Sequence, residues 1–227
     1  YELVKTMRAS IYVLGPLVAR FGRARVSLPG GCAWGPRPVD LHIRGMEQLG
    51  ALVEIDHGYI VAPAERLKGA NIYFDVTSVG ATGQLMMAAS LADGVTVIDN
   101  AAAEPDIVAL GEYLNAMGAR VSGLGTKRVE IEGVRTLVPR EADVIPDRIE
   151  AGTFLVAGAI TGSTIRLQNV TPDHVTAVIR KLEAMGSTVA TDGADLIVSG
   201  PDRPEAVEVT TAPYPGFPTD MQAQIMA

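Results

Sequence analysis

Leu49-Gly50-Ala51-Leu52-Val53 recurs along this chain as Met117-Gly118-Ala119-Arg120-Val121 and as Met185-Gly186-Ser187-Thr188-Val189, each glycine standing 68 residues after the previous one. Each copy ends an amphipathic segment that predicts a helix, over Val39–Leu49, Pro105–Met117 and Pro172–Met185. The shared glycine is expected directly after the helix C-terminus, where φ is positive and a Cβ atom is unfavourable. Two equal spacings indicate a true structural repeat.

Further elements recur around each copy. Turns at 57–58, 123–125 and 192–193 predict hairpins, whose second strands include Val129–Glu132 and Leu196–Ser199. Upstream, apolar helices are expected over 11–20, 83–92 and 154–160, and each leads through a glycine into a strand over 24–28, 95–98 or 163–167. With a further strand expected at each junction, the sequence predicts an α/β fold in which a βαβαββ unit is used about three times.

Composition narrows the class of protein. The 227 residues are 48% hydrophobic but 5% aromatic, so an aliphatic core is expected. The net charge of −7 argues against a general nucleic-acid binder, and the apolar runs are too short to predict membrane insertion. However, residues 1–42 hold six basic and two acidic side chains, so anionic small molecules are plausible ligands for that region.

The single cysteine, Cys32, excludes an internal disulfide and suits a reducing compartment. It lies in a loop rich in glycine and proline, Pro29–Asp40, which disfavours regular structure there. Arg37 stands five residues later and is expected to lower the pKa of the thiol. From these residues alone, an inert thiol and a catalytic thiol both remain open.

We expect two domains, 1–145 with two repeat units and 146–227 with the next unit and the start of another, because Pro139–Asp143 is polar and marked by proline. The proline-rich segment after Gly200 is predicted to contain a strand over Ala206–Thr210. Both ends of the chain read as helix interior, so we expect a piece of a longer protein.

Four separated motifs carry a family resemblance: 29–42, Ser78–Thr82, Pro146–Glu150 and Phe217–Gln224. Together they resemble the UDP-N-acetylglucosamine enolpyruvyl transferases, over the whole chain and in the expected order. This resemblance implies the inside-out α/β barrel that these enzymes share with the shikimate-pathway EPSP synthases. It also implies transfer of enolpyruvyl from phosphoenolpyruvate to the 3′-hydroxyl of UDP-N-acetylglucosamine, the first committed step of peptidoglycan synthesis, in the bacterial cytoplasm.

The resemblance also implies roles for particular residues. Cys32 matches the family's proton donor and the target of fosfomycin, which is consistent with a thiol tuned towards neutral pH. Arg8 and Arg37 match arginines that bind the anionic substrates. The loop that holds the uridine corresponds to Arg37, Pro38, Val39, Asp40 and Leu41.

A second segment, formed by Val76, Thr77, Ser78 and Val79, matches one near the diphosphate of the sugar nucleotide. Ser78 is expected to cap the following helix, whose first N–H groups suit an anion. Val76 stands where some members carry lysine, so this position supplies no side-chain charge.

Asp220 matches the aspartate that takes the proton from the sugar hydroxyl. We expect Arg148 and Glu150 to be ion-pair residues of an interdomain hinge. No cofactor is expected, and no metal, because His42, His57 and His174 lack the spacing of metal ligands.

Other interpretations stay open at this point. Another enolpyruvyl transferase would act on a shikimate phosphate, although Cys32 and the 37–41 loop argue against it. A non-catalytic repeat scaffold would keep the fold without the chemistry. The chain has no counterpart of an N-terminal Lys-Asn pair or of later substrate contacts of the family, so we expect it to be inactive alone and to expose apolar repeat interfaces.

Overall fold

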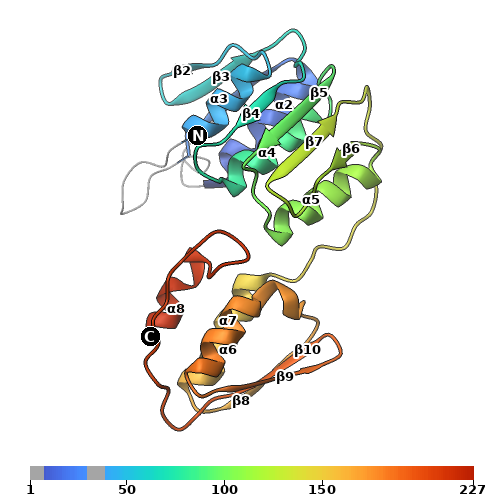
Figure 1. Cartoon of the computed structure of the whole chain (residues 1–227). Coiled ribbons are helices and arrows are strands. Elements are labelled where there is room, and N and C mark those ends of the chain that lie inside the picture. Colours follow the sequence, from blue (N-terminus) through green and yellow to red (C-terminus); the bar gives the residue numbers. More distant parts are fainter. Residues whose placement is uncertain (1–7, 30–38) are drawn as a thin grey trace. The chain divides into compact units, whose positions relative to one another are not determined.

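The computed structural model describes residues 8–29 and 39–227, with the side chain of Arg8 excepted. It divides the chain into two compact units, Tyr1–Ala142 and Asp143–Ala227. Figure 1 shows both in the colours of the sequence. No helix in the described ranges combines the length and the apolar character needed to cross a bilayer.

The second repeat contains every strand and helix of a βαβαββ unit (Figure 1). Its elements are β4 (Asn71–Tyr73), α4 (Val79–Ala89), β5 (Val95–Asp99), α5 (Pro105–Ala116), β6 (Arg120–Ser122) and β7 (Arg128–Glu132). They form a mixed sheet of order β4-β5-β7-β6, in which β4 runs parallel to β5 and the other neighbours are antiparallel. The predicted repeat unit is therefore confirmed here in full.

The first and third repeats show the same plan around three-stranded antiparallel sheets. The first contains η1 (Arg8–Val13), α2 (Leu14–Phe21), β1 (Arg23–Ser27), α3 (Asp40–Gln48), β2 (Glu54–Asp56) and β3 (Tyr59–Pro63). The third contains α6 (Arg148–Ile160), β8 (Thr164–Leu167), η2 (Pro172–Val175), α7 (Thr176–Ala184), β9 (Thr188–Asp192) and β10 (Asp195–Ser199). Their strand orders, β1-β3-β2 and β8-β10-β9, match the order β5-β7-β6 of the second repeat. After the third repeat come η3 (Thr219–Met221) and α8 (Gln222–Met226).

The recurring glycine closes the second helix of each repeat in the same way. Gly50, Gly118 and Gly186 have φ values of 93°, 101° and 97°. In each case the glycine N–H donates to the carbonyl three residues back, and the following N–H donates to the carbonyl five residues back, at 2.9–3.0 Å. This pair of bonds is the Schellman ending of a helix, which explains why glycine recurs at these positions.

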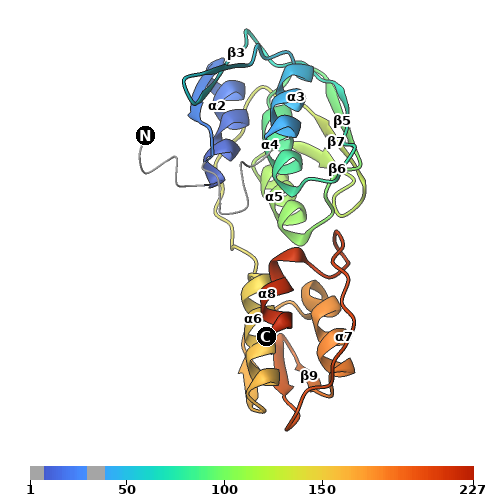
Figure 2. The same cartoon turned by 90° about the vertical axis from the view of Figure 1, so that its left-hand side faces the viewer.

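The core of the first unit is aliphatic, as expected, and it surrounds helix α4. Leu85 and Met86 of α4 are fully buried, and the helix packs against α2, α3 and α5. Figure 2 shows α4 among the other helices of this unit. Among the described residues, Phe74 is the one aromatic in the group of large, fully buried side chains. A helix that is apolar on all sides is stable only when neighbours surround it, as they do here.

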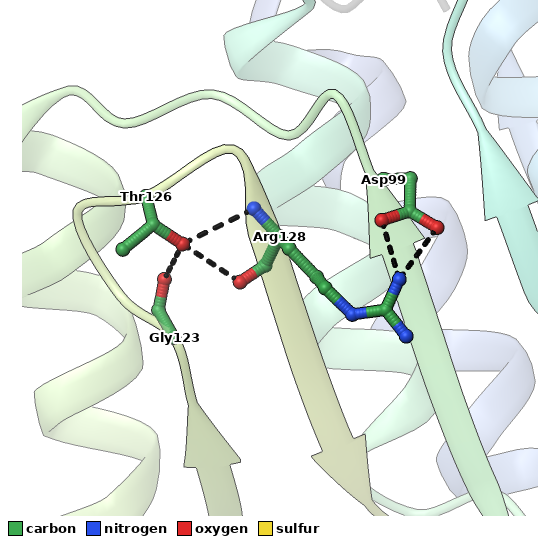
Figure 3. Close-up of polar contacts among 4 residues, drawn as sticks. All are labelled: Asp99, Gly123, Thr126 and Arg128. Atoms are coloured by element: carbon green, nitrogen blue, oxygen red, sulfur yellow. Dashed lines mark hydrogen bonds and ion pairs between the residues drawn. The ribbon is translucent and has the colours of Figure 1, made fainter.

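The hairpin of the second repeat is held by polar contacts at its turn (Figure 3). The Thr126 hydroxyl lies 2.8 Å from the carbonyl oxygen of Gly123, and it accepts the Arg128 N–H at 3.1 Å. One guanidinium nitrogen of Arg128 donates to both carboxylate oxygens of Asp99, at 2.7 and 3.0 Å. These contacts join the starting end of β7 to the final residue of β5.

Three predictions on local structure were wrong. No strand forms over Ala206–Thr210, where the Glu208 carbonyl accepts a hydrogen bond from Lys181 Nζ, and the only pairing nearby in the described chain is a Thr211–Phe217 bridge. A strand requires a hydrogen-bonded neighbour, and alternation of residue types does not supply one. The junction strand expected before α6 is also absent from residues 136–147. Helix α6 begins earlier than expected, because Asp147 caps it, whereas α4 begins directly after Ser78, its predicted cap.

Candidate functional site

Two segments that the sequence motifs singled out meet at one cavity of the first unit. The cavity has a volume of about 400 Å³ and is lined by the first residues of α3 and by the segment that precedes α4. Its lining residues are Asp40, Leu41, His42, Arg44, Asp75, Val76, Thr77 and Ser78. Because α3 packs against both α4 and β4, these segments are held together by the core of the unit.

Two helices begin at this cavity, since α3 starts at the lining residue Asp40 and α4 starts directly after the lining residue Ser78. Ser78 caps α4 as predicted, since its Oγ accepts the Ala81 N–H at 3.2 Å. Its carbonyl accepts the Thr82 hydroxyl at 2.7 Å, which fixes the first turn from the other side. Val79 is the first helical residue, and the earliest N–H groups of a helix have no carbonyl partner inside that helix. Such an end favours an anion through its N–H groups and its dipole.

Charged side chains of both signs also line the cavity. Asp40 lies in the first turn of α3, and its carboxylate is 3.7 Å from the guanidinium of Arg44 one turn later. Both side chains are more than half exposed, so their attraction is screened by water. Asp75 is exposed on the facing segment, and Val76 has 70% of its surface accessible.

A buried polar cluster supports the wall of the cavity. His42 is 7% exposed, and its Nδ1–H donates to the side-chain amide oxygen Oε1 of Gln84. Burial lowers the pKa of His42 from its ordinary value of 6.5, while the hydrogen bond with Gln84 and the charge of Asp40 oppose this shift. The ring of Tyr12 meets the His42 ring edge-on, with the two centroids 6.2 Å apart. Burial, and then the charge of Asp106, raises the pKa of Tyr12, so both rings are neutral near pH 7.

Other predicted residues lie elsewhere. Cys32, Arg37 and Pro38 are outside the described residues. Arg8 begins η1, and its side chain is not described. Val39 immediately precedes α3 and is half-buried.

Asp220 lies in the second unit, exposed within η3. The next residue, Met221, is fully buried and packs against α6, where the Cβ of an alanine in place of Gly152 would come 2.9 Å from its sulfur. Gln224 Nε2 donates to the hydroxyl of Thr153 at 3.0 Å. These contacts fix the backbone that carries Asp220.

Arg148 and Glu150, predicted as hinge residues, stand in the first turn of α6. The Arg148 guanidinium lies 6.0 Å from the ring centroid of Tyr214. Asp147 caps this helix by accepting the N–H groups of Ile149 and Glu150, at 2.7 and 3.1 Å. The hinge role stays a prediction.

Three lining residues were not predicted as part of a site. His42 was considered only as a metal ligand, and no group of three metal-binding side chains occurs within the described residues. Arg44 follows Asp40 by one helical turn, and Asp75 adjoins Val76, so spacing along the chain could have pointed to both.

The three repeats and the cavity define a protein with the enolpyruvyl transferase fold. The enolpyruvyl transferase NikO from Streptomyces tendae aligns with 99% of this chain and 54% of its own, with a TM-score of 0.83 and 22% identity. EPSP synthase from Acinetobacter baumannii aligns with 91% of this chain and 49% of its own, with a TM-score of 0.64 and 22% identity.

Residues 1–227 match the family described as EPSP synthase (3-phosphoshikimate 1-carboxyvinyltransferase), and the chain belongs to this family. It is 56% identical over 227 residues to proteins named UDP-N-acetylglucosamine 1-carboxyvinyltransferase from Geobacter metallireducens and from Caldanaerobacter subterraneus subsp. tengcongensis. The chain spans 54% and 55% of these relatives, about half their length. The resemblance in the sequence motifs is thereby confirmed.

Proposed function

We propose that the protein to which this chain belongs transfers enolpyruvyl from phosphoenolpyruvate to the 3′-hydroxyl of UDP-N-acetylglucosamine and releases phosphate. The observation that carries the proposal is the cavity where the start of α3 meets the segment before α4. These are the segments that the family resemblance assigns to the uridine and to the diphosphate. Relatives that are 56% identical bear the name of this activity, which favours it over transfer to a shikimate phosphate.

The two segments at the cavity are assigned to different parts of the sugar nucleotide. Residues Arg37, Pro38, Val39, Asp40 and Leu41 hold the uridine, while the helix start at Val76–Val79 receives the diphosphate through N–H groups. With valine at position 76, the anion depends on backbone N–H groups and on cations from elsewhere in the protein.

The reaction then needs two proton transfers at one carbon. The 3′-oxygen of the sugar bonds to C2 of phosphoenolpyruvate while C3 gains a proton. Loss of a proton from C3 and cleavage of the bond between C2 and the phosphate oxygen give the enol ether and inorganic phosphate. Cys32 donates and recovers the proton at C3, and Asp220 takes the proton of the sugar hydroxyl. Arg8 and Arg37 neutralise the substrate anions.

Mass spectrometry of the full-length protein with fosfomycin tests the role of the thiol. We expect a covalent adduct on Cys32 that forms faster when UDP-N-acetylglucosamine is present, and no adduct on the Cys32→Ala variant. An unlabelled Cys32 would contradict the proposed mechanism.

Phosphate release with alternative acceptors tests the substrate. We expect release with phosphoenolpyruvate and UDP-N-acetylglucosamine, and none with a shikimate phosphate. Release with the shikimate phosphate alone would replace the proposed function, and release with neither would favour a non-catalytic scaffold. We expect the isolated 227-residue chain to be inactive, because substrate contacts of the family lie outside it. The proposal places the protein in the bacterial cytoplasm, in keeping with a single free cysteine.

A further inference from the structure

A single side chain outside the cavity fastens the segment that forms one of its walls. Asn100 follows strand β5, and its Nδ2 donates to the carbonyl of Phe74 at 2.8 Å. Its Oδ1 accepts the hydroxyl proton of Thr77 at 3.1 Å. The two bonds span the three peptide units that carry Asp75 and Val76, both of which line the cavity.

The two ends of this wall are also held by residues at the end of β5 and shortly after it. The Phe74 side chain is 1% exposed, and its N–H donates to the carbonyl of Asp99 at 3.2 Å. Downstream, the Ala102 N–H donates to the Thr82 hydroxyl at 3.0 Å, and that hydroxyl donates to the carbonyl of Ser78. Asn100 therefore supplies the contacts for the middle of the wall, between two ends that are already fixed.

The residue type matches the two bonds. The Phe74 carbonyl needs a hydrogen-bond donor, and the Thr77 hydroxyl needs an acceptor. The carboxamide of Asn100 provides both, through Nδ2 and Oδ1. Asn100 also has a positive φ of 57°, a conformation that asparagine tolerates better than most side chains. Aspartate would keep only the acceptor, and glycine would keep only the backbone conformation.

The third repeat offers a matched position without this wall. Asn169 stands 69 residues after Asn100, follows β8, and also has a positive φ, of 54°. Its exposed turn is fixed by its N–H, which donates to the carboxylate of Asp195 at 3.1 Å. The backbone turn is thus common to both repeats, whereas the bonds to Phe74 and Thr77 belong to the cavity.

We propose that Asn100 is a positioning residue that acts through Thr77. It holds residues 74–77 so that the start of α4 faces the diphosphate of the sugar nucleotide. This inference rests on the proposed function in what it says of the ligand. What the inference says of the conformation of residues 74–77 does not depend on the proposed function, and the two parts are tested separately.

Hydrogen exchange of the full-length protein without ligand tests the loop. We expect Asn100→Gly to raise exchange in peptides covering residues 74–79 by at least about tenfold. The variant loses two hydrogen bonds, and each contributes up to about that factor. Asn100→Asp should give a smaller rise, and Asn169→Gly should leave these peptides unchanged. Unchanged exchange in Asn100→Gly would overturn the positioning role, whatever the enzyme does.

Steady-state kinetics of the same variants test the ligand. We expect Asn100→Gly to raise the KM for UDP-N-acetylglucosamine about tenfold, with the KM for phosphoenolpyruvate and kcat within about twofold of the wild type. Thr77→Val should produce a similar KM effect, Thr77→Ser should raise the KM less than Thr77→Val, and Thr77→Val combined with Asn100→Gly should add little to either single change.

The outcomes separate the two ideas. A loosened loop with an unchanged KM for the sugar nucleotide would refute the link to the diphosphate. If the wild-type protein does not turn over UDP-N-acetylglucosamine, the proposed function fails, and the exchange data still decide whether Asn100 holds the loop.

Discussion

Replacing Gly80 with alanine should disturb the buried cluster beneath the cavity. Gly80 is the second residue of α4, and the added Cβ would lie 3.0 Å from His42 Nε2 and 3.2 Å from the hydroxyl oxygen of Tyr12. Ordinary contacts of a Cβ atom fall between 3.4 and 4 Å. Because His42 is buried and bonded to Gln84, its ring must move against packed neighbours.

The expected cost follows from two opposing effects. Overpacking a well-packed site costs about 1–3 kcal/mol. Alanine gains up to about 1 kcal/mol over glycine in a helix interior, and less in the first turn, where Gly80 stands. We therefore expect Gly80→Ala to lose about 1–2 kcal/mol of stability and to lower the Tm accordingly. Displacement of His42 from the cavity wall should also raise the KM for the sugar nucleotide about three- to tenfold.

Gly83 of the same helix provides the control. An alanine Cβ there would lie 3.3 Å from Cδ1 of Ile107 and 3.4 Å from Cδ2 of Leu110, the ends of side chains that can adjust. Gly83→Ala should keep the wild-type KM and melt at the same temperature or slightly higher. Calorimetry and kinetics on the full-length protein measure both variants, and equal Tm and KM values for the two would refute this account.

Three further outcomes follow from features of the first unit. Burial holds the pKa of His42 below its unfolded value of 6.5, so stability should fall as the pH drops below about 6.5, where the unfolded chain binds the proton more readily. Urea unfolding at about pH 5.5 and 7.5 should show a smaller difference for His42→Gln than for the wild type. Gly118→Ala should cost about 1–2 kcal/mol in urea unfolding, because its φ is 101° and no atom crowds the new Cβ, and Gly118→Asn should cost less. Removing the Arg128–Asp99 pair with Arg128→Ala should cost less than about 1 kcal/mol, because both side chains are more than a third exposed, and a larger loss in the same assay would contradict this (Figure 3).

The repeat could be predicted because its signals are local. A glycine after a helix and an apolar stripe leave the same mark wherever they occur, and the predicted C-terminal glycines all adopt positive φ. The strand expected over Ala206–Thr210 failed because pairing depends on a distant neighbour that the local pattern does not encode. The start of α6 was placed too late because Asp147 caps this helix upstream of its apolar run.

The candidate site was predictable to a smaller extent. Ser78 could be recognised as a cap because the signal is confined to one turn. The meeting of Asp40 with Asp75 at one cavity, and the fastening of Thr77 by Asn100, depend on packing between elements far apart in sequence. Such contacts are set by the assembled core, and no short window of residues contains them.

The Schellman turns and the shared sheet order have a consequence for how such proteins change during evolution. In each repeat a glycine turn ends the second helix, and the strands keep the same order. The connection from the first antiparallel strand to the second helix takes no part in either feature. This connection covers residues 100–104 in the second repeat and 168–171 before η2 in the third, but 28–39 in the first, where Cys32 is carried. One copy of a duplicated scaffold can therefore lengthen this connection by insertion while the other copies keep short ones. Grafting a short connection into the first repeat should remove the chemistry proposed for Cys32 and leave the fold of the repeat intact.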